Sequence, residues 1–262
     1  MTEDPPVNAE VVPAAGPTAE PSSDIAEYDL RYRDVFWAGR GYEDRCDRIA
    51  IRALLPPRGE RLVEIAAGFG RLIDEYTGYA SVTLFDASSE LLGAARDRLG
   101  SDPRLEFIPG DAHRLPFPDA SFDAVVCVRA VHNFADPATV FAEFARVLRP
   151  GGVLVLEFAN KRHLKSIARW VLRRQCWSPF SPEPHEYRPL HFDRSPAQVK
   201  GLLRAAGFRI GPVRAVSLFR LGAVTSRLSP GLLASVEAPL QAPLGPLAIG
   251  PSVYLRARRP RA

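Results

Sequence analysis

A glycine-rich stretch at residues 62–71 carries the clearest chemical signal in this 262-residue sequence. It reads Leu-Val-Glu-Ile-Ala-Ala-Gly-Phe-Gly-Arg, an apolar run followed by small residues at Ala66, Gly68 and Gly70. Small residues let the backbone turn tightly and let a ligand approach main-chain atoms. A helix that starts after such a turn also offers unpaired N–H groups. The stretch therefore predicts a ligand-binding turn between a strand and a helix.

Acidic residues follow the next two apolar runs. Asp86 comes 22 residues after Glu64, close to the spacing of about 20 expected between a glycine-rich loop and an acid that binds ribose hydroxyls. Asp111, within Pro-Gly-Asp-Ala, can place a carboxylate beside an adenine amino group. These residues predict a nucleotide-type ligand, although a glycine-rich turn alone is also compatible with a strand-to-helix connection that binds nothing.

The elements that must position these residues alternate between short apolar runs and helical patterns. A first helix should end before Pro56. Strands are expected at 61–66, 81–85, 105–108, 124–128 and 152–157, and helices at 72–79, 89–99, 138–148 and 196–206. The strands are apolar on both faces, as in a parallel sheet that is covered by helices. This alternation predicts a doubly wound α/β sheet.

With these motifs the sequence resembles the class I S-adenosylmethionine-dependent methyltransferases of the small-molecule type 11 group, which includes quinone-biosynthesis enzymes. The motifs are Glu-Ile-Ala-Ala-Gly-Phe-Gly at 64–70, the loop at 109–112, the run at 115–123, and Leu-Arg-Pro-Gly-Gly at 148–152. Ala66 stands where the family pattern has its first glycine. The resemblance covers about 62–157 and implies a Rossmann-like, mostly parallel sheet of seven strands with helices on both faces. Its last two strands should be antiparallel, at 213–218 and 252–258.

The resemblance also implies a cofactor, S-adenosyl-L-methionine, and the residues that would hold it. Glu64 would lie near the methionine ammonium group, Asp86 would bind the ribose hydroxyls, and Asp111 would read the adenine edge. The full set of cofactor-binding residues that it implies is Glu64, Ala66, Gly68, Gly70, Asp86, Ala87, Ser88, Asp111, Ala112 and Arg129. Ser88 is equally compatible with a simple helix cap. No Cys or His spacing indicates a metal site.

The methyl acceptor is expected beyond the fourth strand. His132 is the candidate general base, because the ordinary pKa of histidine lies near neutrality; the alternative is a polar turn with a packing role. An aromatic-rich insertion follows the fifth strand and, in this fold, commonly covers the acceptor. The candidate substrate-pocket residues are Asn133, Trp177, Phe180, Tyr187 and His191. They predict a small apolar or aromatic acceptor that is methylated on O, C or N.

Residues 161–174 form a basic segment with apolar residues at helical spacing, Leu164, Ile167, Ala168 and Val171. We expect its apolar face to pack inward, which is the usual arrangement. The alternative is peripheral contact between this helix and an anionic membrane. No uninterrupted apolar run is long enough to span a bilayer.

Charge and composition divide the chain. Residues 1–24 contain five acidic and no basic residues, so the formal charge of +4 for the whole chain becomes +9 for the remainder. We expect a disordered acidic tail at 1–24 and one methyltransferase domain at 25–262. Within it we expect a helical cover at 25–55, a cofactor-binding core at 56–160, an insertion over the acceptor site at 161–194, and a C-terminal helix with the last strands at 195–262.

The three cysteines, Cys46, Cys127 and Cys176, do not indicate a disulfide framework, and no secretory signal is recognisable. These features predict a cytoplasmic protein.

Three other functions compete with catalysis of methyl transfer to a small molecule. A protein that binds S-adenosylmethionine without turnover would keep the same motifs. A nicotinamide-dependent oxidoreductase should show G-x-G-x-x-G, which is absent at 66–71. A nucleic-acid methyltransferase would suit the charge of +9, but the residues after the fourth strand read Arg-Ala-Val-His-Asn-Phe and the basic residues are dispersed. We therefore expect no nucleic-acid partner, and the oligomeric state stays open.

Overall fold

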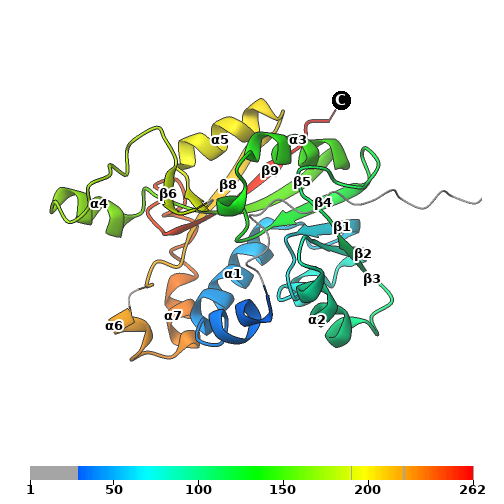
Figure 1. Cartoon of the computed structure of the whole chain (residues 1–262), viewed down its shortest axis with the longest axis horizontal. Coiled ribbons are helices and arrows are strands. Elements are labelled where there is room, and N and C mark those ends of the chain that lie inside the picture. The colour runs from blue at the N-terminus through cyan, green and yellow to red at the C-terminus, as the bar shows by residue number, and fades with distance from the viewer. Residues whose placement is uncertain (1–28, 190, 221, 262) are drawn as a thin grey trace, which may run out of the picture.

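A seven-stranded sheet runs through the centre of the molecule, with its strands in the order β3-β2-β1-β4-β5-β9-β8 (Figure 1). The computed structural model describes residues 29–189, 191–220 and 222–261. The acidic tail expected at 1–24 lies outside these residues. Strands β1 to β5 are parallel, whereas β9 pairs antiparallel with both β5 and β8. The expected doubly wound sheet of seven mostly parallel strands is therefore confirmed.

The strands of the sheet lie close to the runs expected from the sequence. Their bounds are β1 Gly59–Ile65, β2 Tyr79–Asp86, β3 Leu105–Pro109, β4 Phe122–Cys127, β5 Leu148–Ala159, β8 Arg209–Val216 and β9 Ser252–Arg258. Successive residues of each central strand enter opposite cores, as the two-residue period of a strand requires. Leu62 packs into one hydrophobic cluster and Val63 into the other, and Ala124 and Val125 divide in the same way.

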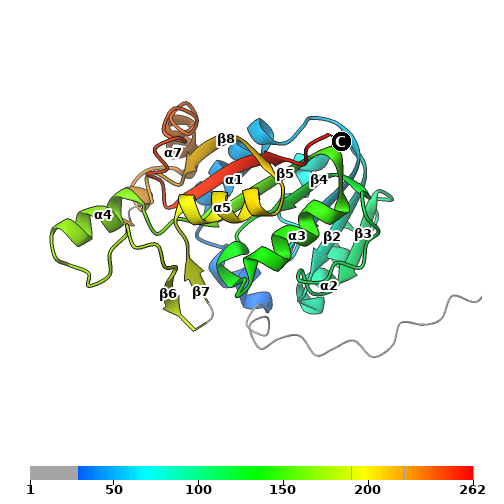
Figure 2. The ribbon, with the colours of Figure 1, turned by 90° about the horizontal axis from the view of Figure 1, so that it is seen from above.

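Helices cover both faces of the sheet (Figure 2). The helix bounds are α1 Gly41–Leu54, α2 Ser89–Leu99, α3 Pro137–Val147, α4 Leu164–Val171, α5 Pro196–Ala205, α6 Gly222–Thr225 and α7 Pro230–Glu237. Residues of α1, α2 and α7 belong to one buried cluster, and those of α3 and α5 belong to the other. A short π-helix, η1 at Tyr32–Phe36, precedes α1. The sheet is thus buried on both faces, which explains why its strands are apolar throughout.

Capping side chains set the starts of three of the helices that the sequence predicts. The Ser88 hydroxyl accepts a hydrogen bond from the Leu91 backbone N–H at the start of α2. Asp136 accepts from the backbone of the first turn of α3, where Pro137 occupies the first position. Ser195 and Gln198 form a reciprocal capping box on α5. Each cap satisfies N–H groups that a helix leaves unpaired, and each lies where the sequence predicts a helix to begin.

The prediction of a helix at 72–79 is wrong. Only one 3-10 turn, η2 at Ile73–Tyr76, forms there, and β2 already starts at Tyr79. Leu72, Ile73 and Tyr76 are buried, so their spacing reflects the packing of a tight connection. With Gly70 and Gly78 on either side, the segment is too short for a longer helix.

Residues 161–193 form a lobe beyond the end of β5. It contains α4 and a hairpin of β6 (His185–Arg188) and β7 (His191–Asp193). The chain leaves and re-enters the body at one place, because Asn160 bridges to Arg194 and the Lys161 N–H donates to the Arg194 carbonyl over 3.2 Å. The Asn160 side-chain amide donates to the Ala248 and Gly250 carbonyls, and the Arg194 guanidinium donates to the Val131 and Phe134 carbonyls.

The expectation that the apolar face of α4 packs inward is also wrong. Leu164 and Val171 are 61% and 65% exposed, whereas Ser166, on the other side of the helix, is buried. The lobe extends away from the sheet in both ribbon views (Figures 1 and 2), so α4 has little protein to pack against. No helix of the described residues is long and apolar enough to cross a membrane.

Candidate active site

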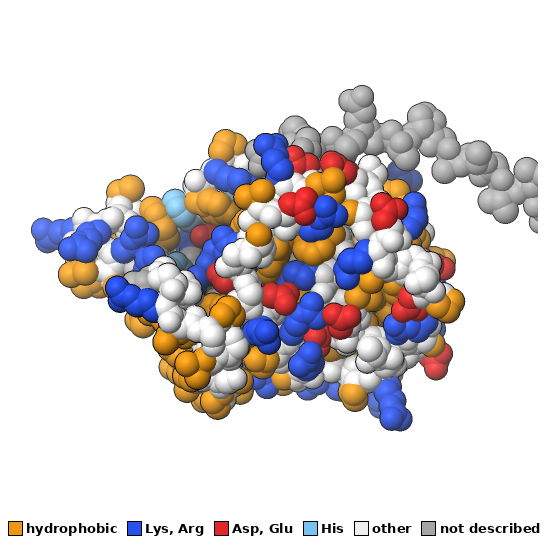
Figure 3. All heavy atoms as spheres, turned by 90° about the horizontal axis from the view of Figure 1, so that it is seen from below, with side chains coloured by type: hydrophobic (Ala, Val, Ile, Leu, Met, Phe, Trp, Pro, Cys, Tyr) orange, Lys and Arg blue, Asp and Glu red, His pale blue; other side chains and the backbone are white. Residues whose placement is uncertain are grey.

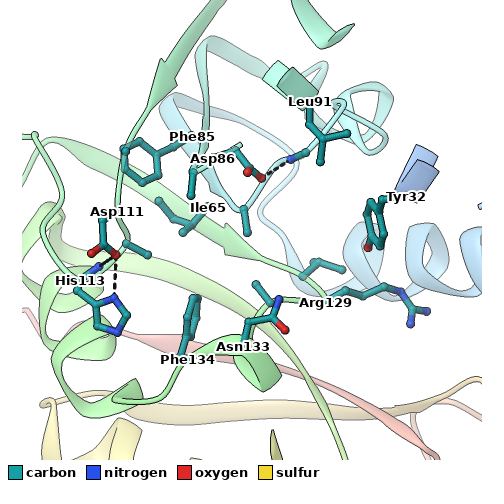
Figure 4. Close-up of a pocket in the computed structure, with 17 residues that line it drawn as sticks. Tyr32, Ile65, Phe85, Asp86, Leu91, Asp111, His113, Arg129, Asn133 and Phe134 are labelled. Carbon is teal, nitrogen blue, oxygen red and sulfur yellow. Dashed lines mark hydrogen bonds and ion pairs between the residues drawn. The ribbon is translucent and has the colours of Figure 1, made fainter. Parts of the chain in front are cut away.

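A first pocket opens at the carboxyl ends of β1, β2, β3 and β4 (Figure 4). Strand order reverses between β1 and β4, and open α/β sheets bind ligands at such a switch point. The pocket encloses about 800 Å³ including its open mouth. Its walls are Tyr32, Ile65, Ala66, Gly68, Phe85, Asp86, Ala87, Leu91, Gly110, Asp111, Ala112, His113, Val128, Arg129, Ala130, Asn133 and Phe134.

Left-handed backbone shapes the floor of this pocket. Ala66, Gly68 and Gly70 have φ values of +58°, +53° and +69°, a region that glycine enters without the steric cost of a Cβ. At Gly68 the nearest atom to an added Cβ would be Leu91 Cδ1 at 3.8 Å, an ordinary van der Waals contact, so no atom crowds this position. At Gly70 an added Cβ would lie 2.8 Å from Leu99 Cδ1. The missing side chain at Gly68 thus leaves the backbone open to a ligand, and the missing side chain at Gly70 lets α2 pack closely.

Asp86 ties the glycine-rich turn to the end of β2. Its Oδ2 accepts a hydrogen bond of 2.6 Å from the Gly68 N–H, and its Oδ1 accepts one of 2.8 Å from the Ser88 N–H. Burial raises the pKa of this carboxyl, while the Ser88 and Gly68 N–H groups act in the opposite direction. Each oxygen retains a further lone pair. The carboxylate can therefore accept hydroxyl donors from a ligand without releasing the turn.

The opposite wall of the pocket carries Asp111. Its Oδ1 accepts from the His113 N–H over 2.9 Å and contacts His113 Nδ1 at 2.7 Å. The His113 ring lies edge-on to the Phe134 ring, 6.1 Å away between centroids. The wall thus combines a carboxylate with two flat rings, which is suited to a planar heterocycle with an exocyclic amino group.

Glu64 lies behind the pocket rather than in its wall. Its side chain is fully buried, and burial raises its pKa to about 8. Its Oε2 has no hydrogen-bond partner among the described residues. A buried carboxyl with an unpaired oxygen is costly unless a donor or cation reaches it. The neighbouring residues Ile65 and Ala66 do line the pocket, so a ligand ammonium group is chemically suited to this place.

A second cavity adjoins the first and shares Tyr32 and Arg129 with it. It encloses about 1950 Å³ including open solvent. Its walls are Asp29, Arg31, Tyr32, Val35, Phe36, Arg129, His132, Glu157, Ala159, Tyr187, Arg188, Asp193 and Arg220. These side chains come from the segment before α1, the connection after β4, the end of β5, the β6–β7 hairpin and the loop after β8. Side chains that are distant in sequence therefore build it.

Arg129 separates the two cavities. It has a left-handed φ of +56°, and its N–H donates to Glu157 Oε2 over 2.7 Å. Its guanidinium binds both oxygens of the buried Asp47 of α1, at 2.9 and 3.0 Å. Arg71 binds the same carboxylate at 3.0 Å. Both guanidinium groups lie over the Trp37 ring. This network holds the segment before α1 against the sheet, beside the shared wall.

Two ionisable side chains in the second cavity have strongly shifted pKa values. Burial, followed by the charges of His191 and of Arg129, Arg188 and Arg194, lowers the pKa of His132 to about 3. Burial, followed by the charge of Glu157, raises the pKa of Asp193 to about 6. Glu157 itself accepts from the Arg129 N–H and from the Ser252 hydroxyl. Near neutral pH the cavity therefore holds a neutral imidazole beside a carboxylate that titrates close to neutrality.

The structure brings most of the residues predicted for the cofactor into one pocket. Those that line the first pocket are Ala66, Gly68, Asp86, Ala87, Asp111, Ala112 and Arg129, together with Asn133, which was predicted for the acceptor. Gly70 packs beneath the turn, Glu64 lies behind it, and Ser88 caps α2. His132 and Tyr187 line the second cavity. His191 is buried, with its ring 5.8 Å from that of His132.

Two residues predicted for the substrate pocket lie elsewhere. Trp177 stacks on His185 at a centroid distance of 3.9 Å, and Phe180 lies edge-on to Trp170 at 5.7 Å. Neither lines either cavity, because this part of the lobe extends outward. Sequence reasoning missed Tyr32, Arg188, Asp193 and Arg220. Tyr32 stands in an aromatic run that could have marked it, whereas Asp193 has no neighbouring motif.

The described residues contain no group of three or more His, Cys, Asp or Glu side chains placed to hold a metal ion. Within the same part of the chain, Cys46 and Cys127 are buried free thiols and Cys176 is an exposed one.

Comparisons with known proteins show that the chain is similar to methyltransferases. A family model described as a methyltransferase domain matches residues 63–156. Demethylmenaquinone methyltransferase of Thermotoga maritima is 32% identical over 203 residues, which cover 71% of this chain and 85% of the relative. A ubiquinone/menaquinone biosynthesis C-methyltransferase of Pseudomonas savastanoi is 36% identical over 143 residues, 52% of this chain but only 55% of the relative.

A solved structure shares the fold. It is titled a methyltransferase dependent on S-adenosylmethionine, possibly a histamine N-methyltransferase, from Thermotoga maritima. It superposes with a TM-score of 0.62 at 21% identity, over 88% of this chain and 96% of that one.

Proposed function

This chain belongs to the class I S-adenosylmethionine-dependent methyltransferases of the type 11 group, and from that premise we propose that it methylates an aromatic, quinol-type acceptor. The observation that carries the proposal is the contiguity of the two cavities, which share Tyr32 and Arg129. A donor and an acceptor that meet at a common wall are placed for direct transfer between them.

We assign the first pocket to S-adenosylmethionine, whose sulfonium supplies an already activated methyl group. Asp86 would accept the ribose hydroxyls on its free lone pairs, and Asp111 would accept the adenine amino group. Glu64 would pair with the methionine ammonium, which accounts for its unpaired buried oxygen. Gly68 would let the ligand approach the backbone closely. Ala66, Ala87, Ala112 and Arg129 would complete the walls, with Gly70 and Ser88 supporting the turn and α2.

We assign the second cavity to the acceptor. Tyr32, Phe36 and Tyr187 provide aromatic walls, and Arg188 and Arg220 provide donors for ring oxygens. The names of the two relatives, which both specify quinones, support a hydroxylated aromatic ring methylated on carbon. Such acceptors partition into lipid. We place the chain on the cytoplasmic side of the membrane in which such acceptors dissolve.

A ring carbon becomes a better nucleophile when a neighbouring hydroxyl gives up its proton. His132, the base expected from the sequence, has a pKa of about 3 and is a weak proton acceptor. Asp193 lines the same cavity with a pKa of about 6 and accepts no hydrogen bond among the described residues. We therefore propose that Asp193 takes the hydroxyl proton and that the ring carbon accepts the methyl group as the bond from that group to the donor sulfur breaks. The hydrogen of that carbon would then pass as a proton to the ring oxygen, which restores the aromatic hydroxyl, and Asp193 would release its proton to solvent. His132 would contact the acceptor as a neutral imidazole, with Asn133 beside it.

The simplest experiment separates binding from turnover. Calorimetry should detect S-adenosylhomocysteine bound to the wild type, and transfer of a labelled methyl group should be measured to a prenylated naphthohydroquinone. Binding with no turnover of this probe, or of a catechol and an amine offered as O- and N-acceptors, would favour a non-catalytic binding protein. Absence of binding would remove the assignment of the first pocket.

A further inference from the structure

Helix α4 is inverted relative to an ordinary surface helix. Leu164, Ile167, Ala168 and Val171 recur at spacings of three and four residues and so form one stripe along it. Leu164, Ala168 and Val171 are exposed and Ile167 is half-buried, whereas Ser166, which faces the opposite direction, is buried. A surface helix normally turns its apolar stripe toward the core and its polar residues toward water. This one turns a serine toward the protein and an apolar stripe away from it.

Specific contacts fix this orientation. The Ser166 hydroxyl accepts a hydrogen bond of 3.2 Å from the Gln175 amide, and the Leu164 N–H donates to the Ile249 carbonyl over 2.9 Å. At the base of the lobe, the Lys161 ammonium donates to the Glu183 carbonyl. The apolar stripe is therefore held outward by hydrogen bonds on the inner side of the helix.

The charge around the stripe has one sign. No acidic residue occurs between Glu157 and Glu183. The exposed ionisable side chains on and beside α4 are all basic, namely Arg162, Lys165, Arg169, Arg173 and Arg174. Figure 3 shows lysine and arginine together with apolar side chains at the end of the molecule that α4 forms in Figure 1. Trp170 and Leu172 are exposed as well, and tryptophan favours the membrane interface.

We propose that α4 docks flat on an anionic phospholipid surface, with its apolar stripe in the acyl boundary and its basic residues among the headgroups. An outward stripe with basic flanks is what interfacial helices present to a bilayer. A second copy of the chain fits less well, since two such faces would bring like charges together. A nucleic acid would use the basic residues but would leave the stripe exposed to water.

The docked helix lies one connection away from the acceptor cavity. The chain runs from α4 through residues 172–184 into the β6–β7 hairpin, which supplies Tyr187, Arg188 and Asp193 to the cavity wall. If the proposed quinol-type acceptor is correct, docking places that cavity beside the phase in which the acceptor dissolves. The docking itself does not depend on the acceptor, so its test needs no substrate.

Co-sedimentation of the full chain with phosphatidylcholine vesicles, with and without phosphatidylglycerol, provides this test. We expect binding that requires phosphatidylglycerol and weakens with added salt. The double variant Leu164→Glu with Val171→Glu should reduce the partition constant by about tenfold or more. Lys165→Glu with Arg169→Glu should also reduce it by about tenfold. Binding of S-adenosylhomocysteine by each variant reports that the fold is intact.

The matched control is Leu232→Glu with Val236→Glu on α7. These residues are 52% and 49% exposed on a helix that carries no basic residue, so vesicle binding should stay as in the wild type. Equal losses in the α4 and α7 variants, or equal binding to vesicles without phosphatidylglycerol, would overturn the proposal. A dimer that light scattering detects in the wild type and that the α4 variants dissociate would also overturn the proposal. Binding of a nucleic acid that displaces the vesicles, and that the Leu164 variant retains, would do the same.

Discussion

The two cavities are formed in different ways, one by backbone conformation and the other by side-chain packing. The first is shaped by backbone, through the left-handed turn at Ala66, Gly68 and Gly70 and a carboxylate that binds main-chain N–H groups. Apart from Tyr32 and Leu91, its residues lie at the ends of adjacent parallel strands and in the connections that follow them. The second is shaped by side chains that come from five separate parts of the chain. One cavity is therefore fixed locally and recognises a constant ligand, whereas the other depends on distant packing and can vary in the ligand that it takes.

The largest effect is expected in the second cavity. Asp193→Asn should lower turnover by about 100-fold or more, the usual contribution of a positioned proton acceptor. With a pKa of about 6, wild-type turnover should rise with pH through that value and level off above it, because only the carboxylate accepts a proton. Rate profiles against pH, measured with the prenylated naphthohydroquinone, check this expectation.

His132→Ala is the companion to that measurement. If Asp193 is the base, the His132 variant keeps the pH dependence near 6 although its rate falls. If instead the pH dependence of turnover near 6 is lost in the His132 variant and kept in Asp193→Asn, His132 would be the base.

The next largest effect is expected in the first pocket. Asp86→Ala removes charge-assisted hydrogen bonds to Gly68 and Ser88 as well as the proposed ribose contacts. The affinity for S-adenosylhomocysteine should fall by about 100-fold, since hydrogen bonds to charged groups contribute about 1.5–3 kcal/mol each. Asp119→Ala is the control, because that aspartate lies outside both cavities and its side chain is 77% exposed. Calorimetry that finds equal affinities would contradict the assignment.

Two glycines separate stability from binding within the same turn. Gly70→Ala strains a left-handed position and crowds Leu99 and Leu84, so the free energy of unfolding should fall by about 1–3 kcal/mol. Gly68→Ala also strains the backbone but crowds no neighbouring atom, so it should lower ligand affinity by about tenfold at a smaller cost of about 1 kcal/mol in stability. Denaturant titration measures the stability of both variants, and calorimetry measures their ligand affinity. A larger loss of stability in Gly68→Ala than in Gly70→Ala would contradict this prediction.

The smallest expected effect is the release of protons from Glu64 when the ligand binds. With a pKa of about 8, Glu64 is mostly protonated at neutral pH and must lose its proton to pair with an ammonium group. Binding of S-adenosylhomocysteine should therefore release up to about one proton below that pH, and affinity should rise with pH and level off above it. Calorimetry in buffers of different protonation enthalpy counts the protons. Glu64→Gln should release none, and a release equal to the wild type would exclude Glu64.

The same contrast explains what could be predicted from the sequence. Ala66, Gly68, Asp86 and Asp111 could be identified because small residues and acids at strand ends act through local backbone geometry. Asp193 could not, since its importance arises from Glu157 and Arg220, which reach it from other elements. The spacing of Leu164, Ile167, Ala168 and Val171 predicted an amphipathic helix correctly, but periodicity does not state which side meets the protein. For Trp177 and Phe180 the sequence likewise does not state that this part of the lobe extends outward, away from both cavities.

The bridge between Asn160 and Arg194 brings the two ends of residues 161–193 together at one place on the body of the molecule. None of the strands of the central sheet and none of the glycine-rich turn lies within this segment. The segment does contain Tyr187, Arg188 and Asp193 of the second cavity and the outward helix α4. Sequence changes confined to it can therefore alter part of the acceptor wall and the outward helix together, while the residues of the glycine-rich turn stay the same.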